Sequence, residues 1–160
     1  MVVKKVLSSL VILMLSIGSA SALEIPGKVF YSIKRTGDVV SRDMVLDLPA
    51  RGEGDIVLRS ASRNFSMTAK KSFTKRKRGQ KTFYMVYIMK APDSVGGQKS
   101  AMIFKGTYLR GKNLATYYGD MYSKKINDDQ EVEELEGLEE KEDCLEGYEF
   151  KGGFSFEIEI

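Results

Sequence analysis

The chain has 160 residues, a length typical of a single domain, and its hydrophobic (42%) and charged (29%) fractions fit a folded globular protein rather than a disordered one. Histidine and tryptophan are absent and cysteine occurs once. The chain therefore cannot form a Ser-His-Asp or Cys-His catalytic site, a His-ligated zinc site or an internal disulfide. We expect a protein that is not an enzyme and that uses no metal or cofactor.

The N-terminus has the order of a secretory signal. Two lysines precede an apolar run from Val6 to Ile17, and small residues follow up to an A-x-A site that ends at Ala22. The apolar run is short for a membrane span, although an uncleaved anchor is an alternative. We predict a signal peptide at residues 1–22, cleavage after Ala22, export to the periplasm and a single β-rich domain at residues 23–160.

Charge is divided unevenly along this domain. Residues 23–125 carry 21 Lys/Arg against 8 Asp/Glu, a net of +13, whereas residues 126–160 carry 2 against 14, a net of −12. The acidic residues concentrate in an insertion at about 127–147, which we interpret as a solvated loop or a helix because apolar residues recur at every third position. Cys144 lies in this insertion, and its acidic neighbours disfavour the reactive thiolate.

A dense basic run occupies the middle of the chain. Seven Lys/Arg residues occur between Lys70 and Lys81, with Gly79 as a turn residue. The simplest interpretation is the solvated tip of a β-hairpin, and the functional alternative is contact with an anionic membrane surface. The contacting residues would then be Lys75, Arg76, Lys77 and Arg78. Export makes nucleic acid a poor partner for this run.

The rest of the domain is predicted to form short strands bounded by glycine and polar clusters. The predicted strands are Val29–Ile33, Val39–Leu48, Asp55–Arg59, Phe65–Thr68, Thr82–Lys90, Ser100–Leu109, Leu114–Tyr122 and, after the acidic insertion, Tyr148–Ile160. The connections are too short for crossover helices, so the fold is predicted to be mainly β, an antiparallel meander with one short helix at most.

Side-chain alternation distinguishes two of these strands. Along the last one, aromatic and aliphatic side chains share one face: Tyr148, Phe150, Phe154, Phe156, Ile158 and Ile160. Along Thr82–Lys90 both faces are apolar, so this strand needs a core on one side and a helix lid or an apolar cavity on the other. Six methionines follow the signal, and they are either ordinary core residues or the lining of a pocket for flexible apolar ligands.

Several stretches of the C-terminal half carry a family resemblance. They are Ala91–Gly97 (APDSVGG), Met102–Phe104 (MIF), Asn113–Tyr118 (NLATYY), the closing Lys124–Ile126 (KKI) and Phe150–Glu157 (FKGGFSFE). Together they resemble the periplasmic outer-membrane lipoprotein-sorting proteins of the LolA-like superfamily, which show a P-x-D-V-x-G-T-like turn, apolar and tyrosine-rich strands, and a Phe-Ser-Tyr-Glu pattern. The chain has Gly119 where the family has proline, and the family pattern continues through further strands beyond the last matched stretch.

The resemblance implies an incomplete, unclosed barrel or a strongly curved sheet that cups a helix and leaves a sheet edge to be covered. It also implies a non-catalytic periplasmic carrier or binding protein that holds lipoprotein acyl chains or other lipids in an apolar cavity, with a membrane transport protein as a further partner. The expected lining residues are Met85, Tyr87, Met89, Met102, Phe104, Tyr118, Phe154 and Phe156.

Two other functions stay open from the sequence. A small outer-membrane β-barrel fits the export signal, but the shortest predicted strands do not reach the roughly 9 to 11 residues that a span needs. A secreted structural or adaptor domain would instead associate through its opposite charge lobes, and salt would weaken that association.

Overall fold

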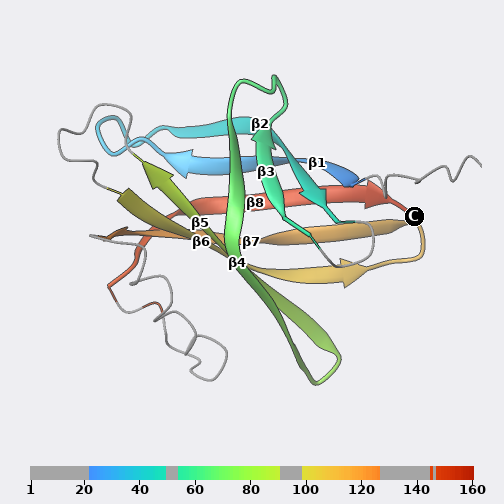
Figure 1. Ribbon diagram of the computed structural model, residues 1–160. Coiled ribbons are helices and arrows are strands. Elements are labelled where there is room, and N and C mark those ends of the chain that lie inside the picture. Colours follow the sequence, from blue (N-terminus) through green and yellow to red (C-terminus); the bar gives the residue numbers. More distant parts are fainter. Residues whose placement is uncertain (1–21, 50–53, 91–98, 127–144, 146) are drawn as a thin grey trace, which may run out of the picture.

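Eight antiparallel strands form a closed barrel in the computed structural model, which describes residues 22–49, 54–90, 99–126, 145 and 147–160. Each strand pairs with the next one along the chain, and β8 pairs back with β1 (Figure 1). The strands are β1 (Leu23–Ser32), β2 (Val39–Leu48), β3 (Val57–Ser60), β4 (Ser66–Lys77), β5 (Gln80–Lys90), β6 (Lys99–Arg110), β7 (Leu114–Ile126) and β8 (Glu149–Glu159). Within these ranges no helix is long and apolar enough to cross a membrane.

The closed barrel corrects the expectation of an unclosed barrel or curved sheet. Residues Gly27–Tyr31 of β1 pair with residues Gly152–Phe156 of β8, which joins the first strand to the last. An open sheet would leave two edges with unpaired backbone N–H and C=O groups, and closure gives the groups on both edges hydrogen-bond partners. The sequence pattern did not reveal this closure because it depends on a pairing between the two ends of the domain.

Some predictions concern residues outside the described ranges. They are the signal peptide, the Ala91–Gly97 turn, the helix alternative for the acidic insertion, and Cys144. The described residues contain no helix for the sheet to cup.

Each predicted strand corresponds to one observed strand, with different ends in most cases. β2 has the predicted bounds, whereas β1 begins at Leu23 instead of Val29 and β4 continues to Lys77 instead of Thr68. Within the part of β1 that was not predicted, Pro26 faces out of the barrel and Gly27 lies against β8. The sequence prediction therefore located the strands correctly and underestimated the lengths of those that contain proline or dense charge.

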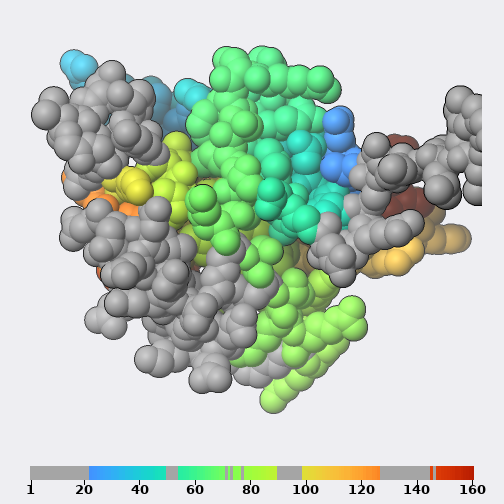
Figure 2. Space-filling view, in the orientation of Figure 1, coloured from blue at the N-terminus to red at the C-terminus, as the bar shows by residue number. Residues whose placement is uncertain are grey.

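The basic run forms the tip of the β4–β5 hairpin, as predicted. Arg78 and Gly79 occupy its turn with φ angles of 51° and 82°, the left-handed conformation that two-residue hairpin turns require. Beyond Ala69, β4 pairs only with β5 among the described strands. The hairpin tip consequently stands clear of the barrel wall (Figures 1 and 2).

The interior of the barrel is apolar and filled. Buried side chains from all eight strands form one cluster: Ile25, Val29, Met44, Leu46, Leu58, Met67, Phe83, Met85, Tyr87, Phe104, Met121, Phe154 and Phe156. The ring centroid of Phe104 lies 5.3 Å from that of Tyr87 and 5.2 Å from that of Phe154. Eight strands enclose an interior that side chains can just fill, and packed rings occupy the middle of this barrel.

The outer face of β5 is also covered, which agrees with the prediction that this strand is buried on both faces. Val86 and Ile103 are fully buried there, next to Ala101 and Ile126. Leu145 and Tyr148 pack against this outer cluster. The chain that leads into β8 therefore supplies part of the cover.

The predicted alternation of the last strand is correct only after Gly152. Phe154 and Phe156 face the interior, but Phe150 is 59% exposed and packs edge-on against Tyr122, with ring centroids 5.9 Å apart. The β7–β8 register shifts next to Tyr122, and such a bulge reverses the face on which the preceding residues lie. A strict two-residue period along the whole strand was therefore the wrong assumption.

Glycines allow the strands to approach closely enough to close the barrel. A Cβ atom on Gly119 would lie 2.1 Å from the carbonyl oxygen of Lys105, and one on Gly106 would lie 2.6 Å from the ring of Phe83. A Cβ on Gly27 would lie 2.2 Å from the carbonyl oxygen of Ser155. No side chain fits at these positions without moving backbone or core rings.

We expect Gly119→Ala to lower the free energy of unfolding by about 1–3 kcal/mol, the usual range for overpacking. Gly153→Ala is the matched control, because its nearest neighbour would be the carbonyl oxygen of Gly119 at 3.2 Å. Urea unfolding followed by circular dichroism measures both. Equal stability of the two variants would contradict the role given to Gly119 in closure.

Candidate functional site at the mouth of the barrel

A cleft of about 260 Å³ opens at the end of the barrel from which the β4–β5 hairpin projects. We call this cleft the mouth. It is lined by Leu46, Leu48, Pro49, Gly54, Ile56, Ser72, Thr74, Lys81, Phe83, Tyr84, Met85 and Tyr117. Small-molecule sites usually begin at about 300 Å³, so the mouth fits a flexible chain or a small ring rather than a large ligand.

The shortness of β3 creates the mouth. β3 has 4 residues, whereas its neighbours β2 and β4 have 10 and 12. The first residue of β3, Val57, pairs with Asp47 of β2 and with Thr68 of β4, so Leu48 of β2 and the part of β4 beyond Thr68 have no β3 between them. Side chains of β2 and β4 consequently line a gap in the wall.

The floor of the mouth is the outermost layer of the core. Phe83 is only 7% exposed, and its ring centroid lies 5.5 Å from Tyr117 and 5.9 Å from Phe154. Met85, the next inward-facing residue of β5, is also buried. A ligand in the mouth would therefore contact the apolar core directly.

The rim of the mouth is polar and cationic. Lys81 lies with its ammonium group 5.1 Å from the ring centroid of Tyr108, which in turn lies 4.7 Å from the ring of Tyr117. Burial raises the pKa of the Tyr117 phenol and Tyr108 raises it further, so Tyr117 is neutral at physiological pH. Among the lining residues, the charge at the rim thus comes from Lys81.

Arg59 holds β3 in place beside the mouth. Its Nε donates to Oδ2 of Asp47 at 2.8 Å, and its Nη2 lies 3.0 Å from Oε1 of Glu24. The hydrogen bond to Asp47 raises the pKa of Arg59 above its ordinary value. The other oxygen of Asp47, Oδ1, is buried without a hydrogen-bond partner among the described residues. Asp47 therefore depends on Arg59, and this ion pair secures the short strand.

We expect Arg59→Gln to speed backbone amide exchange in β3, because Asp47 would lose its cationic partner while still half-buried. Hydrogen–deuterium exchange with mass spectrometry measures this on peptides that cover Val57–Ser60. Arg63→Gln is the control, since Arg63 is an exposed residue of the following turn. The same exchange rate in both variants would contradict the role of Arg59.

Seven of the eight predicted lining residues lie in the barrel interior. They are Met85, Tyr87, Phe104, Phe154 and Phe156, which are buried, and Met89 and Met102, which are partly buried and pack against them. The hydroxyl of Tyr87 donates to Sδ of Met85 at 3.5 Å, and burial raises the pKa of this phenol. Met85 is the member of this set that reaches the mouth.

Tyr118 is a correction to the predicted lining. It is 40% exposed on the outer face, because Tyr117 takes the inward position of this strand and neighbouring residues face opposite sides. There it lines a depression of about 500 Å³ that lies over Gly106, Gly119 and Gly153. The one-residue difference in register moved the ring to the other side of the wall.

Several residues of the mouth were missed by the sequence analysis, namely Leu46, Ser72, Thr74, Lys81, Phe83 and Tyr117. The alternation of Phe83 with Met85 was a usable signal, because it places both on one face. No comparable signal existed for Ser72 and Thr74, since their position at the mouth depends on where β3 begins.

All six methionines of the domain lie in the interior or pack against it. They are Met44, Met67, Met85, Met89, Met102 and Met121. Methionine is flexible and fills irregular spaces. A core with this composition can change shape near the mouth at little cost.

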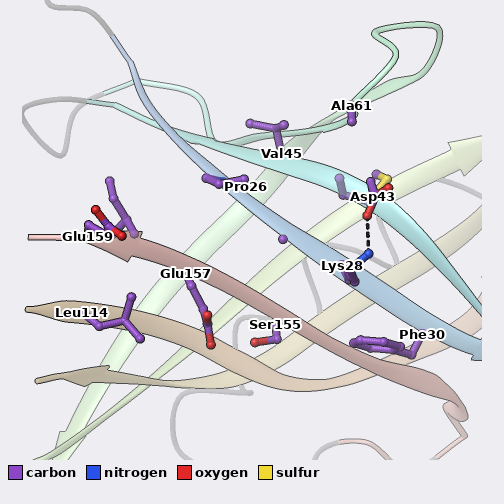
Figure 3. Close-up of a pocket in the computed structure, with 13 residues that line it drawn as sticks. Pro26, Lys28, Phe30, Asp43, Val45, Ala61, Leu114, Ser155, Glu157 and Glu159 are labelled. Atoms are coloured by element: carbon purple, nitrogen blue, oxygen red, sulfur yellow. Dashed lines mark hydrogen bonds and ion pairs between the residues drawn. The ribbon is translucent and has the colours of Figure 1, made fainter.

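A larger depression, of about 800 Å³, lies on the outer face over β1, β2 and β8 (Figure 3). Lys28 Nζ lies 2.6 Å from Oδ1 of Asp43 across it, with side chains that are 53% and 69% exposed. Glu157 and Glu159 line the same depression from β8. Solvent screens charges as exposed as these. The apolar side chains Phe30 and Leu114 that also line this depression are themselves exposed, whereas the floor of the mouth is buried.

The residues predicted to touch an anionic surface lie at the hairpin tip. Lys75, Arg76 and Arg78 are exposed there, and Figure 2 shows the tip as a narrow projection at the lower right. The side chain of Lys77 lies outside the described part of the structure.

The described residues contain no group of three or more His, Cys, Asp and Glu side chains that could hold a metal ion. No protein-family model matches the chain, and comparisons with curated proteins and with solved structures found no match. The resemblance to LolA-like proteins stays a prediction from the sequence.

Proposed function

We propose that this protein is a non-catalytic binding protein or carrier for an aliphatic chain, of a lipid or of a lipoprotein, that enters the barrel through the mouth. The observation that carries the proposal is a cleft of about 260 Å³ whose floor, Phe83 and Met85, belongs to the apolar core. Burial of the chain would supply about 25 cal/mol per Å² of apolar area. The cost of ordering the chain offsets part of this gain.

The methionine content of the core supports the same proposal. Packed rings fill the interior beneath the mouth. An aliphatic chain that is longer than the mouth can therefore enter further only if core side chains move. Met85 lies at the mouth and pairs with Phe104 on the adjacent strand β6, which pairs in turn with Met121 on β7. Displacement of the flexible methionine side chains would deepen the mouth without opening the barrel.

The cationic hairpin supports delivery of the mouth to an anionic membrane surface. Ser72 and Thr74 of this hairpin form one wall of the mouth, and Lys75, Arg76 and Arg78 follow at its tip. Contact of the tip with anionic headgroups would hold the mouth beside the lipid. The signal-like residues 1–22 support export, and hence action in the periplasm.

The outer face of the barrel favours a binding protein over the outer-membrane alternative. Transmembrane barrels carry an apolar band outside and a polar interior. Here the interior is apolar, and charged residues lie on the outer face of several strands, namely Lys28, Asp43, Asp120 and Glu157. This arrangement is the reverse of a membrane barrel.

A tryptophan placed in the mouth tests the proposal, because the chain has none of its own. Thr74 lines the mouth and is exposed, so Thr74→Trp should fill the cleft without disturbing the core. We expect uptake of a fluorescent fatty acid by the purified domain to weaken about tenfold or more.

Thr68→Trp is the matched control on the same strand, since Thr68 is exposed and does not line the mouth. The intrinsic fluorescence of each variant shows whether its indole meets the ligand. Equal uptake by both variants, or no uptake by the unmodified protein, would overturn the proposal.

The membrane contact has its own test. Replacing Lys75, Arg76 and Arg78 with glutamine should weaken binding to vesicles that contain anionic lipid by up to roughly a hundredfold, because each cation near such a surface contributes about 1 kcal/mol. The control replaces Arg63, Lys112 and Lys125, which are exposed elsewhere. Vesicle sedimentation at low and high salt measures both. Equal loss in the two triple variants would show that net charge, not the hairpin, governs the contact.

A further inference from the structure

Two cations face each other on the hairpin beside the mouth, and one of them, Lys81, lines it. Arg76 and Lys81 are direct partners in the register between β4 and β5. Like charges directly opposite each other destabilise a strand pair. Neither makes an ion pair with a carboxylate in the part of the chain that the structure describes. An anion between them would convert this repulsion into attraction.

Both cations belong to the same face of the hairpin as the floor of the mouth. Residues alternate along a strand, so Lys81 shares a face with Phe83 and Met85, and Arg76 shares one with Thr74 and Ser72. The four-residue step from Lys81 to Met85 spans about 13 Å. The mouth therefore changes along β5 from charged at Lys81 to apolar at Phe83 and Met85, and the hydroxyls of Thr74 and Ser72 lie directly opposite these two floor residues.

The setting of Lys81 favours a strong contact with an anion. Its side chain is half-buried, and its ammonium lies over the ring of Tyr108 rather than against a carboxylate. A charge-assisted hydrogen bond is stronger than a neutral one, and partial removal of water strengthens it further. The hydroxyls of Ser72 and Thr74 line the same wall and offer additional donors.

We infer that the mouth selects amphiphiles with an anionic headgroup, a carboxylate or a phosphate, which Lys81 and Arg76 hold at the rim while the aliphatic tail contacts Phe83 and Met85. The inference rests on the proposed function and specifies its ligand class. It distinguishes Lys81, a residue of the ligand site, from Arg78, which lies in the turn and serves only the surface contact.

Binding of matched twelve-carbon ligands tests the inference. Dodecanoate, dodecyl phosphate, dodecanol and dodecylamine are titrated below their aggregation limits into the domain by calorimetry or by displacement of a fluorescent fatty acid. We expect the two anions to bind roughly tenfold tighter than dodecanol, and dodecylamine to bind weakest. Comparison of dodecanoate with dodecyl phosphate shows which anion the rim prefers.

Variants of the hairpin assign the preference to a residue. Lys81→Met should abolish the advantage of the anions and leave dodecanol binding unchanged, whereas Lys81→Arg should keep the advantage. Arg78→Met removes the same charge from the hairpin outside the mouth and should also keep it. Circular dichroism checks that each variant is folded.

Three results would overturn the inference in distinguishable ways. If dodecanol binds as tightly as dodecanoate and Lys81→Met changes neither, the rim selects no headgroup, although the proposed function stands. If none of the four ligands binds, the proposed function fails and the inference fails with it. Equal loss of anion binding in Lys81→Met and Arg78→Met would also overturn the inference, because the net charge of the hairpin would then explain the preference for anions.

Discussion

The close approach of strands at four glycines is the constraint on which the rest of the structure depends. Gly27, Gly106, Gly119 and Gly152 leave no space for a Cβ atom, because carbonyl oxygens or aromatic rings occupy it. These approaches let eight strands bend into a barrel whose first and last members pair. Closure satisfies the backbone groups that an open sheet would expose, and it sets the diameter of the interior.

That diameter determines where a ligand can lie. A narrow eight-stranded barrel accommodates one set of side chains, and rings such as Phe104 and Phe154 fill its middle. Among the described residues, the cleft that reaches this core opens where β3 begins late, at Val57. The ion pair of Arg59 with Asp47 attaches this short strand to β2. The stability of the β2–β3 pairing and access to the mouth are therefore linked.

In the proposed function, the hairpin has two tasks on one pair of strands. Its inward face continues the apolar floor through Phe83 to the cationic rim at Lys81, while its tip carries Arg78 into solvent. A protein that binds amphiphiles by burial needs no histidine, metal or nucleophile, which is consistent with the composition of the chain. The physical basis of the proposed function is therefore a gradient from charge to hydrocarbon along a single strand.

The sequence by itself determined the strand content, the positions of the strands, the hairpin at Gly79 and the burial of Thr82–Lys90 on both faces, because each follows from local turn chemistry and side-chain period. Only the tertiary structure decided that the barrel closes, that Tyr117 rather than Tyr118 faces inward, and that Phe150 lies outside. These features depend on register, on a bulge and on the pairing of β1 with β8, which join residues far apart in the chain. The mouth belongs to the second group, because it exists where one strand is shorter than its neighbours, and such a difference is defined only after the strands are paired.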